Sequence, residues 1–343
     1  MVISVSESRT ITIVRTCAMF FIILCHYLAF FDGLEALSQL LNVGVPIFFI
    51  ISGFLYGQKR ITNIIQWYKK QFVKIIIPLY TYYLISGFFL LLIGKFGELN
   101  LFEVLKQLLN LQGICGGKIG NIQTGHLWFI TFILICYLIT PLLQLFREKL
   151  NLLRVALLIV VISIAWIAII LNIKNVYFIS WFPGILSYIF SYYLAAYWKR
   201  DNKKLLIFFG SIVLTIGSVA IRLYVKRIVD NGNESLEHFY DCVIVPFSQC
   251  LLAFGLFFIL FFTCLKLDRL NASLSKVFKV FDRYSYYVYI VHYMLVEGVV
   301  ALNLFVDNIF IVSLLFILFT IVYAIVLRWV SNYEIKLFNR KSE

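Results

Sequence analysis

ITIVRTCAMFFIILCHYLAFF, residues 11–31, has the length and apolar character of a transmembrane helix. It nevertheless contains Arg15 and, eleven residues later, His26. On a helix, eleven residues at about 100° each make three turns plus about 20°, so both side chains lie on nearly one face, about 16 Å apart along the axis. Such groups are costly in lipid. We therefore expect this face to line a protein interior or a water-filled cavity.

The whole chain has the composition of an integral membrane protein. Of its 343 residues, 62% are hydrophobic and 14% are charged, and the mean hydropathy is +0.94. A water-soluble domain of this length cannot bury so much apolar surface. Predominantly apolar runs of about 18 residues or more recur along the chain, which favours helices over the alternating strands of a barrel. The expected fold is an all-α, polytopic membrane helix bundle.

The apolar runs predict about ten transmembrane helices in a single domain over residues 1–343, with no additional soluble domain. Lys and Arg concentrate in alternate connecting segments. Because cytoplasmic loops are enriched in these residues, both termini are expected in the cytoplasm. The net charge of +13 is therefore explained by topology, and no nucleic acid partner is expected. The expected spans are residues 11–31, 38–57, 75–94, 126–146, 155–171, 176–198, 205–224, 243–265, 284–306 and 308–330.

Two expected outer loops, residues 95–125 and 225–242, are long enough to carry structure. Within the first, LFEVLKQLLNLQ at residues 101–112 predicts a short amphipathic helix. Each loop contains a cysteine, and a disulfide between Cys115 and Cys242 is one alternative. The seven cysteines show no CxxC pair and no metal-ligand spacing, so no metal site is expected.

The second span contains GVPIFFIISGF, residues 44–54. Pro46 removes a backbone donor inside an apolar helix, which predicts a kink. Ser52 and Gly53 are small, and they permit a close approach of another helix.

A basic cluster precedes the third span. Lys69, Lys70 and Lys74 lie in WYKKQFVKIIIPLY, at its expected cytoplasmic mouth. One interpretation is ordinary anchoring by positive charges. The other is a binding site for an anionic ligand, such as the phosphates of a nucleotide cofactor.

His126 and Trp128 mark the expected outer start of the fourth span, in GHLWFI. Trp128 is explained equally well as an interfacial belt residue. His126 has the same expected depth as His26, although a water-exposed loop position is an alternative for it. Two histidines at one level are more indicative of a site than either alone.

The ninth span contains SYYVYIVHYMLVEG, residues 285–298. His292 follows Ser285 by seven residues, near the middle of the span, where a buried hydrogen bond between helices is the alternative to a functional role. Glu297 lies deeper, and a carboxylate there requires a partner: its own protonation, Arg15 or a histidine.

These motifs occur in one order along almost the whole chain. Arg15 and His26 are spaced as R-x10-H and are followed by VPIFFIISGF, the basic cluster before IIIPLY, HLWFI, FPGILSYI and SYYVYIVH. As a set they resemble the acyltransferase-3 family of membrane acyltransferases. The resemblance implies about ten helices that transfer an acyl group, commonly acetyl, from cytoplasmic acyl-CoA to a hydroxyl of an outer glycan or lipid-linked sugar.

The resemblance also implies roles for individual residues. Arg15 and His26 match the functional pair of the family. Lys69, Lys70 and Lys74 stand where relatives usually carry arginines, so charge is kept but bidentate phosphate contacts are lost. Many relatives carry an extracellular hydrolase-like domain. Here such a step would require a separate extracytoplasmic partner protein, or the step is absent.

The residue chemistry agrees with this reaction. A neutral imidazole suits a general base for a hydroxyl, so His26 is expected to deprotonate the acceptor or to carry the acyl group itself. Arg15 is expected to bind the phosphates of acetyl-CoA or to stabilise the reacting oxyanion. His126, Trp128 and the segment with Ser285, His292 and Glu297 are expected to shape the acceptor side or the pore.

Two other functions fit a basic, ten-span membrane protein. A transporter or flippase of lipid-linked sugars would also carry ionisable groups within the membrane, but no repeat relates the two halves of the sequence. A sensor or scaffold without chemistry would not require both Arg15 and His26. The acyltransferase is therefore the preferred interpretation.

Overall fold

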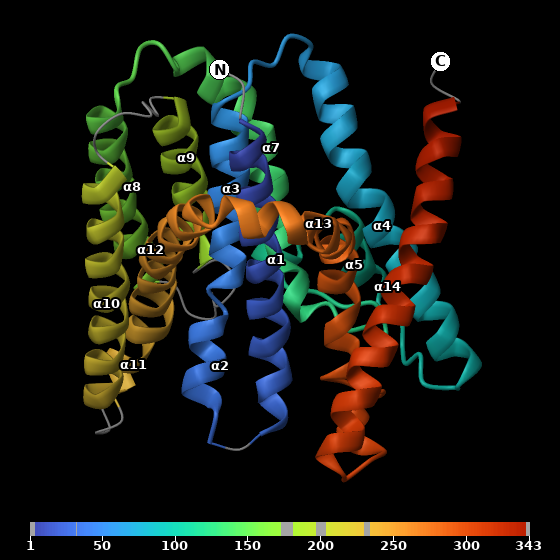
Figure 1. Ribbon diagram of the computed structural model, residues 1–343. Coiled ribbons are helices and arrows are strands. Elements are labelled where there is room, and N and C mark those ends of the chain that lie inside the picture. Colours follow the sequence, from blue (N-terminus) through green and yellow to red (C-terminus); the bar gives the residue numbers. More distant parts are fainter. Residues whose placement is uncertain (1–3, 32, 173–180, 197–203, 230–233, 341–343) are drawn as a thin grey trace. The chain divides into compact units, whose positions relative to one another are not determined.

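The structure is a computed structural model that describes residues 4–31, 33–172, 181–196, 204–229 and 234–340 (Figure 1). Within these residues the regular structure is helical, apart from an isolated bridge between Ile119 and Ile122. The α-helices are α1 Val5–Tyr27, α2 Glu35–Leu41, α3 Gly44–Gly57, α4 Ile64–Leu92, α5 Leu101–Leu108, α6 Gln112–Cys115, α7 Trp128–Phe146, α8 Leu152–Ile170, α9 Pro183–Ala196, α10 Lys204–Val229, α11 Glu234–Phe239, α12 Val245–Lys266, α13 Asp268–Val291 and α14 Ile309–Arg340.

Eight helical segments of the described chain are long and apolar enough to cross a membrane. This confirms the expectation of an all-α, polytopic membrane protein. The side of the membrane on which each terminus lies stays a prediction. The segments are Val5–Tyr27, Glu35–Gly57, Ile64–Leu92, Gly125–Phe146, Leu152–Ile170, Leu205–Val229, Leu236–Lys266 and Ile309–Asn339.

The chain forms two compact units, each assembled from three stretches of sequence. Unit 1 comprises Met1–Phe21, Leu40–Thr62 and Ile135–Lys279, and unit 2 comprises Ile22–Gln39, Asn63–Leu134 and Val280–Glu343. The expectation of one domain over residues 1–343 stays a prediction.

The closest helix contact in unit 1 joins α3 to α9. A Cβ atom at Gly53 or at Gly57, one turn later, would overlap the backbone oxygen of Tyr188 or Tyr192. Only glycine lets the two backbones approach so closely. The expected role of Gly53 in close packing is therefore confirmed.

A second pair of helices in unit 1, α10 and α12, completes a core rich in phenylalanine. Phe257 and Phe261 of α12 stack with ring centroids 5.7 Å apart and are almost fully buried. Gly255 admits α10, since a Cβ atom there would overlap the Thr215 hydroxyl. The buried Arg222 guanidinium on α10 donates a hydrogen bond to Gln249 of α12. Its charge therefore meets a polar partner inside the protein.

Unit 2 is built on the antiparallel pair α4 and α14. The Lys69 Nζ atom lies 5.4 Å from the centre of the Phe338 ring. Further along α4, the Thr81 hydroxyl donates to Glu334 at 2.5 Å, and the Ser86 and Tyr323 hydroxyls bond at 2.6 Å. The partners on α14 run in the opposite order, which fixes the antiparallel register.

The segment between α4 and α7 is ordered by local hydrogen bonds. The Asn100 side chain accepts from the backbone amides of Phe102 and Glu103 and so begins α5. The amphipathic helix predicted here is confirmed as Leu101–Leu108. Cys115 and Cys242 are both free thiols, so a disulfide between them is not formed.

Three expected spans differ in detail. The second is interrupted between α2 and α3, and Pro46 lies in the first turn of α3, where its missing amide donor breaks no helical bond. The predicted kink is therefore a break just before Pro46. The sixth span, residues 176–198, lies partly outside the described residues. The ninth, residues 284–306, is wrong as a continuous helix, because α13 ends at Val291 and short 3₁₀ turns follow.

Candidate active site

Three histidines from distant parts of the sequence meet in unit 2. His26 ends α1, His126 lies in the 3₁₀ turn Gly125–Leu127, and His292 begins the 3₁₀ turn His292–Leu295. The ring centroids of His26 and His292 are 5.2 Å apart, and those of His126 and His292 are 5.4 Å apart. The sequence predicted that His26 and His126 share a level, and the structure adds His292 between them.

The C-terminus of α13 holds two of these imidazoles. A helix leaves its last carbonyl groups without intrahelical partners. His292 Nδ1 bonds the carbonyls of Val288 at 3.1 Å and Tyr289 at 2.9 Å. His126 Nε2 bonds the carbonyl of Ile290 at 2.9 Å. The two histidines therefore cap α13, which explains why the helix ends at Val291.

These hydrogen bonds fix where each ring carries its proton. A carbonyl only accepts, so His292 must be protonated on Nδ1 and His126 on Nε2. The opposite nitrogens, His292 Nε2 and His126 Nδ1, are buried and have no hydrogen-bond partner among the described residues. An unpaired buried acceptor is costly. The site therefore presents two lone pairs ready to accept a hydrogen bond.

His26 is the accessible member of the cluster. His292 has 0% and His126 has 4% of its surface exposed, whereas His26 is only half-buried. By surface exposure, His26 is therefore the least buried of the three histidines.

Two tyrosines complete the cluster. The Tyr293 ring centroid lies 4.7 Å from that of His26 and 4.8 Å from that of His126. The Tyr289 hydroxyl donates to the backbone oxygen of His126 and so holds the turn that carries it. Sequence reasoning missed both residues, because tyrosine recurs throughout SYYVYIVHY and no spacing distinguishes these two.

Glu297 contacts the edge of this cluster through Tyr293. Its side chain is exposed and accepts a hydrogen bond from the Tyr293 hydroxyl. The sequence required a partner for this carboxylate, and the partner that the structure supplies is the Tyr293 hydroxyl. The expected depth of Glu297 assumed a continuous helix through residue 297, and the chain has already left the helix at Val291. The expected role of Glu297 near the acceptor stays a prediction.

Two further residues predicted near the acceptor, Ser285 and Trp128, contact residues of their own helices. The buried Ser285 hydroxyl donates to the Asp282 carbonyl, one turn earlier in α13, at 2.8 Å. Trp128 begins α7 and is buried, with its ring 6.1 Å from that of Phe132. Neither is brought into the histidine cluster by these contacts.

Arg15 lies in a polar part of unit 1. The helix α1 is continuous from Val5 to Tyr27, so it carries Arg15 and His26 on nearly one face, as predicted. The Arg15 charge interacts with the phenols of Tyr56 and Tyr137. Tyr137 in turn bonds the hydroxyl of Ser52. The Arg15 charge therefore acts on two tyrosines of unit 1 that are connected to a polar group of α3.

The three predicted cofactor lysines occupy the first turns of α4 in unit 2. Lys70 and Lys74 are exposed, and Lys69 is half-buried beside Phe338. Their charges are presented together at one end of the helix. Such a cluster can attract phosphate groups.

Comparison with known proteins identifies the family of this chain. A family model described as an acyltransferase domain, that of the acyltransferase-3 family, matches residues 9–331. The chain belongs to the acyltransferase-3 family. It is a membrane acyltransferase. Neither a curated protein nor a solved structure matches the chain.

A separate cavity in unit 1 of the acyltransferase does not suit polar substrates. It has a volume of about 580 Å³ and lies among α8, α9, α10 and α12, with an almost wholly apolar lining that includes Phe190 and Phe254. Two of its hydroxyls, on Ser187 and Ser211, already donate to backbone carbonyls of their own helices. The cavity is therefore better suited to an apolar group than to a sugar or a phosphate.

Among the residues that the structure describes, no group of three or more His, Cys, Asp or Glu side chains is arranged to hold a metal ion.

Proposed function

We propose that this acyltransferase moves an acyl group, in the simplest case acetyl, from cytoplasmic acyl-CoA to a hydroxyl of a cell-surface or lipid-linked glycan. We place the protein in the cell membrane, with both termini in the cytoplasm. The observation that carries the proposal is the half-buried imidazole of His26, which stands beside two buried histidines with unpaired ring nitrogens.

His26 acts on the acceptor in this proposal. One ring nitrogen takes the proton of the glycan hydroxyl while the hydroxyl oxygen attacks the thioester carbonyl carbon. The carbon–sulfur bond breaks, the ester forms, and coenzyme A leaves as the thiol after taking up a proton. In the two-step alternative, the His26 nitrogen attacks the thioester carbonyl carbon, the carbon–sulfur bond breaks, and coenzyme A takes up the imidazole proton and leaves as the thiol. The glycan hydroxyl then attacks the acyl-imidazole, the ester forms as the carbon–nitrogen bond breaks, and the hydroxyl proton returns to the imidazole.

The neighbours of His26 support either route. His292 and His126 are anchored on backbone carbonyls, so their free nitrogens keep a fixed direction. One of these lone pairs can accept a hydrogen bond from the His26 ring or from the acceptor. Such fixed acceptors favour a single orientation of the reacting groups.

The positive residues are assigned to the donor. We propose that Lys69, Lys70 and Lys74 attract the phosphates of acyl-CoA, and that Arg15 contacts a phosphate or the developing oxyanion. The support is their charge and, for Lys70 and Lys74, their exposure. We also propose a separate extracytoplasmic protein as a partner at the acceptor side.

The proposal is tested with sealed membrane vesicles from cells that express the chain. Radiolabelled acetyl-CoA is supplied on the cytoplasmic side, and alkali-labile label on polysaccharide and lipid-linked glycan is measured. We expect label with the natural chain and a loss of about 10²- to 10⁴-fold with His26→Ala, because a general base contributes a factor of this size. A parallel assay with succinyl-CoA identifies the acyl group.

The control is the one other histidine, His238→Ala. His238 lies in unit 1, where its Nε2 atom is 3.4 Å from the Ile170 carbonyl. This variant is expected to retain the natural activity. Near-natural label with a folded His26→Ala protein would contradict the assignment of His26, and movement of lipid-linked sugar without any ester label would favour a flippase.

A further inference from the structure

The chain is helical at the start of α13, where the expected spans left only a connecting loop in the cytoplasm. Residues 268–283 read DRLNASLSKVFKVFDR and begin the α-helix Asp268–Val291. This helix is not among the eight segments long and apolar enough to span a membrane. In Figure 1 its first turns run across the direction of α8 and α10, which belong to the same unit.

Side chains on these turns separate into three rows along the helix. At about 100° per residue, each row contains residues that share one face, and the row of apolar residues lies about 160° from the row of basic residues. The inner row is buried or half-buried: Asn271, Ser275, Phe278 and Asp282. The apolar row is exposed by 41–55%: Leu270, Leu274, Val277 and Phe281. The basic row is exposed: Lys276, Lys279 and Arg283.

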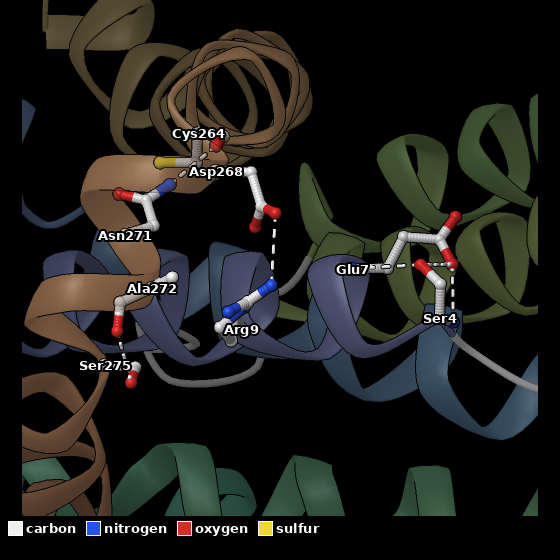
Figure 2. Close-up of polar contacts among 8 residues, drawn as sticks. All are labelled: Ser4, Glu7, Arg9, Cys264, Asp268, Asn271, Ala272 and Ser275. Atoms are coloured by element: carbon white, nitrogen blue, oxygen red, sulfur yellow. Dashed lines mark hydrogen bonds and ion pairs between the residues drawn. The ribbon is translucent and has the colours of Figure 1, made fainter.

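Polar contacts in unit 1 fix the start of α13 (Figure 2). Arg9 Nη2 on α1 donates to Asp268 Oδ2 at 3.1 Å, and Asn271 Nδ2 donates to the Cys264 carbonyl at 2.6 Å. These bonds tie the first turn of α13 to α1 and to the end of α12. They also fix the rotation of the helix about its axis, so the apolar row keeps an outward direction.

The same ion pair sets the depth of α13. Arg9 stands two residues before the apolar run that begins at Ile11, where α1 enters the bilayer. Asp268 is bonded to Arg9 and therefore lies at that level. The first turns of α13 thus start at the boundary between hydrocarbon and headgroups.

We propose that residues 268–283 form an interfacial helix that binds anionic phospholipid. The apolar row enters the acyl chains, and the basic row lies among the headgroups. A groove on a protein contacts one face of a helix and would leave one of these two rows uncovered. At a bilayer boundary, the acyl chains contact the apolar row and the headgroups contact the basic row. The charges complement anionic headgroups, which makes a lipid surface the occupant that this helix fits.

The first test locates the apolar row. The photoreactive residue p-benzoylphenylalanine replaces Val277 or, as a control, the exposed Ala272 about 140° away on the helix. The full chain is placed in vesicles of phosphatidylglycerol and phosphatidylcholine and is illuminated. We expect phospholipid adducts from position 277 to exceed those from position 272 at least fivefold by mass spectrometry. Equal adducts, or a crosslink from 277 to protein, would overturn the proposal.

The second test concerns the basic row. Lys276→Gln, Lys279→Gln and Arg283→Gln are combined, and the matched control combines Lys95→Gln, Lys118→Gln and Arg227→Gln, which removes three exposed charges elsewhere. Retained phosphatidylglycerol and phosphatidylcholine are counted by native mass spectrometry. We expect the preference for phosphatidylglycerol to fall about tenfold in the first variant only. An unchanged preference would overturn the headgroup assignment. Neither test measures acyl transfer, so its outcome is independent of the proposed reaction.

Discussion

The contact between α3 and α9 and the histidine cluster are both buried, but they use burial differently. At Gly53 and Gly57 the helices are so close that a single methyl group would overlap a carbonyl oxygen. Around His292, two ring nitrogens are buried without partners in the described structure. The first site is limited by steric contact. The second is marked by two buried ring nitrogens without partners among the described residues, a feature that it shares with the Ser191 hydroxyl of α9. Unsatisfied polar groups of this kind are concentrated at functional sites.

The most severe way to break the packed site is Gly53→Leu. The Cβ atom of the new side chain would lie 2.3 Å from the Tyr188 carbonyl oxygen. Moving either backbone to relieve this overlap would break the contact between α3 and α9. We expect no folded, monodisperse protein after extraction in detergent. The milder Gly53→Ala is expected to destabilise the protein by about 3 kcal/mol, the upper range for overpacking, as measured by thermal unfolding.

The matched control for this prediction is Gly210→Leu in the same unit. A Cβ atom at Gly210 meets nothing within 4 Å, so the larger side chain has room. This variant should be recovered in normal yield. If Gly53→Leu were recovered equally well, the α3–α9 contact would not determine the fold.

The sequence predicted the α3–α9 contact more completely than it predicted the histidine cluster. Small residues at Ser52 and Gly53 within an apolar helix already predict a close helix contact, because backbone proximity depends on the absence of a side chain. The spacing of Arg15 and His26 likewise predicts their shared face, because α1 has no breaker between them.

The meeting of His126 and His292 could not be predicted in this way. Residues 292–306 are apolar enough to continue a span, and no proline precedes His292 to end the helix. The end of α13 at Val291 depends on side-chain caps, one of them donated by His126 from 164 residues away in the sequence. Such a cap is a tertiary contact and leaves no local pattern. The position of Tyr293 could not be predicted for the same reason, because it depends on the turn that follows the end of α13.

Arg15 has either a structural role, like the packed glycines, or a role in the transfer reaction. Arg15→Lys keeps the positive charge but removes the planar, bidentate guanidinium. We expect kcat/KM for acetyl-CoA to fall at least about tenfold, with an unchanged unfolding midpoint, if the guanidinium contacts phosphate or an oxyanion. Steady-state transfer in vesicles measures this directly.

Arg9→Lys is the matched control, since Arg9 lies on the same helix and pairs with Asp268 through one nitrogen. A lysine can replace that single contact, so its transfer rate should match that of the natural chain. Unchanged kinetics in both variants would leave Arg15 as a residue that only reaches toward the membrane boundary.

The smallest expected effect separates the cap at His292 from its free nitrogen. His292→Asn keeps a donor near the Nδ1 position for the Val288 and Tyr289 carbonyls but removes the buried Nε2 lone pair. We expect the free energy of unfolding to change by no more than about 1 kcal/mol, the value of one hydrogen bond. Turnover should fall about tenfold while KM for acetyl-CoA stays unchanged, because the donor lysines are untouched.

His292→Leu completes this experiment by removing both functions of the ring. It should lose a similar share of turnover but also about 1–3 kcal/mol of stability, because two carbonyls at the end of α13 lose their cap. If the asparagine variant kept full turnover, His292 would act only as a helix cap. The histidine cluster and the glycines of the α3–α9 contact would then both serve the stability of the fold and not the reaction. Loss of turnover at unchanged stability would show that the unpaired nitrogen is retained for the reaction.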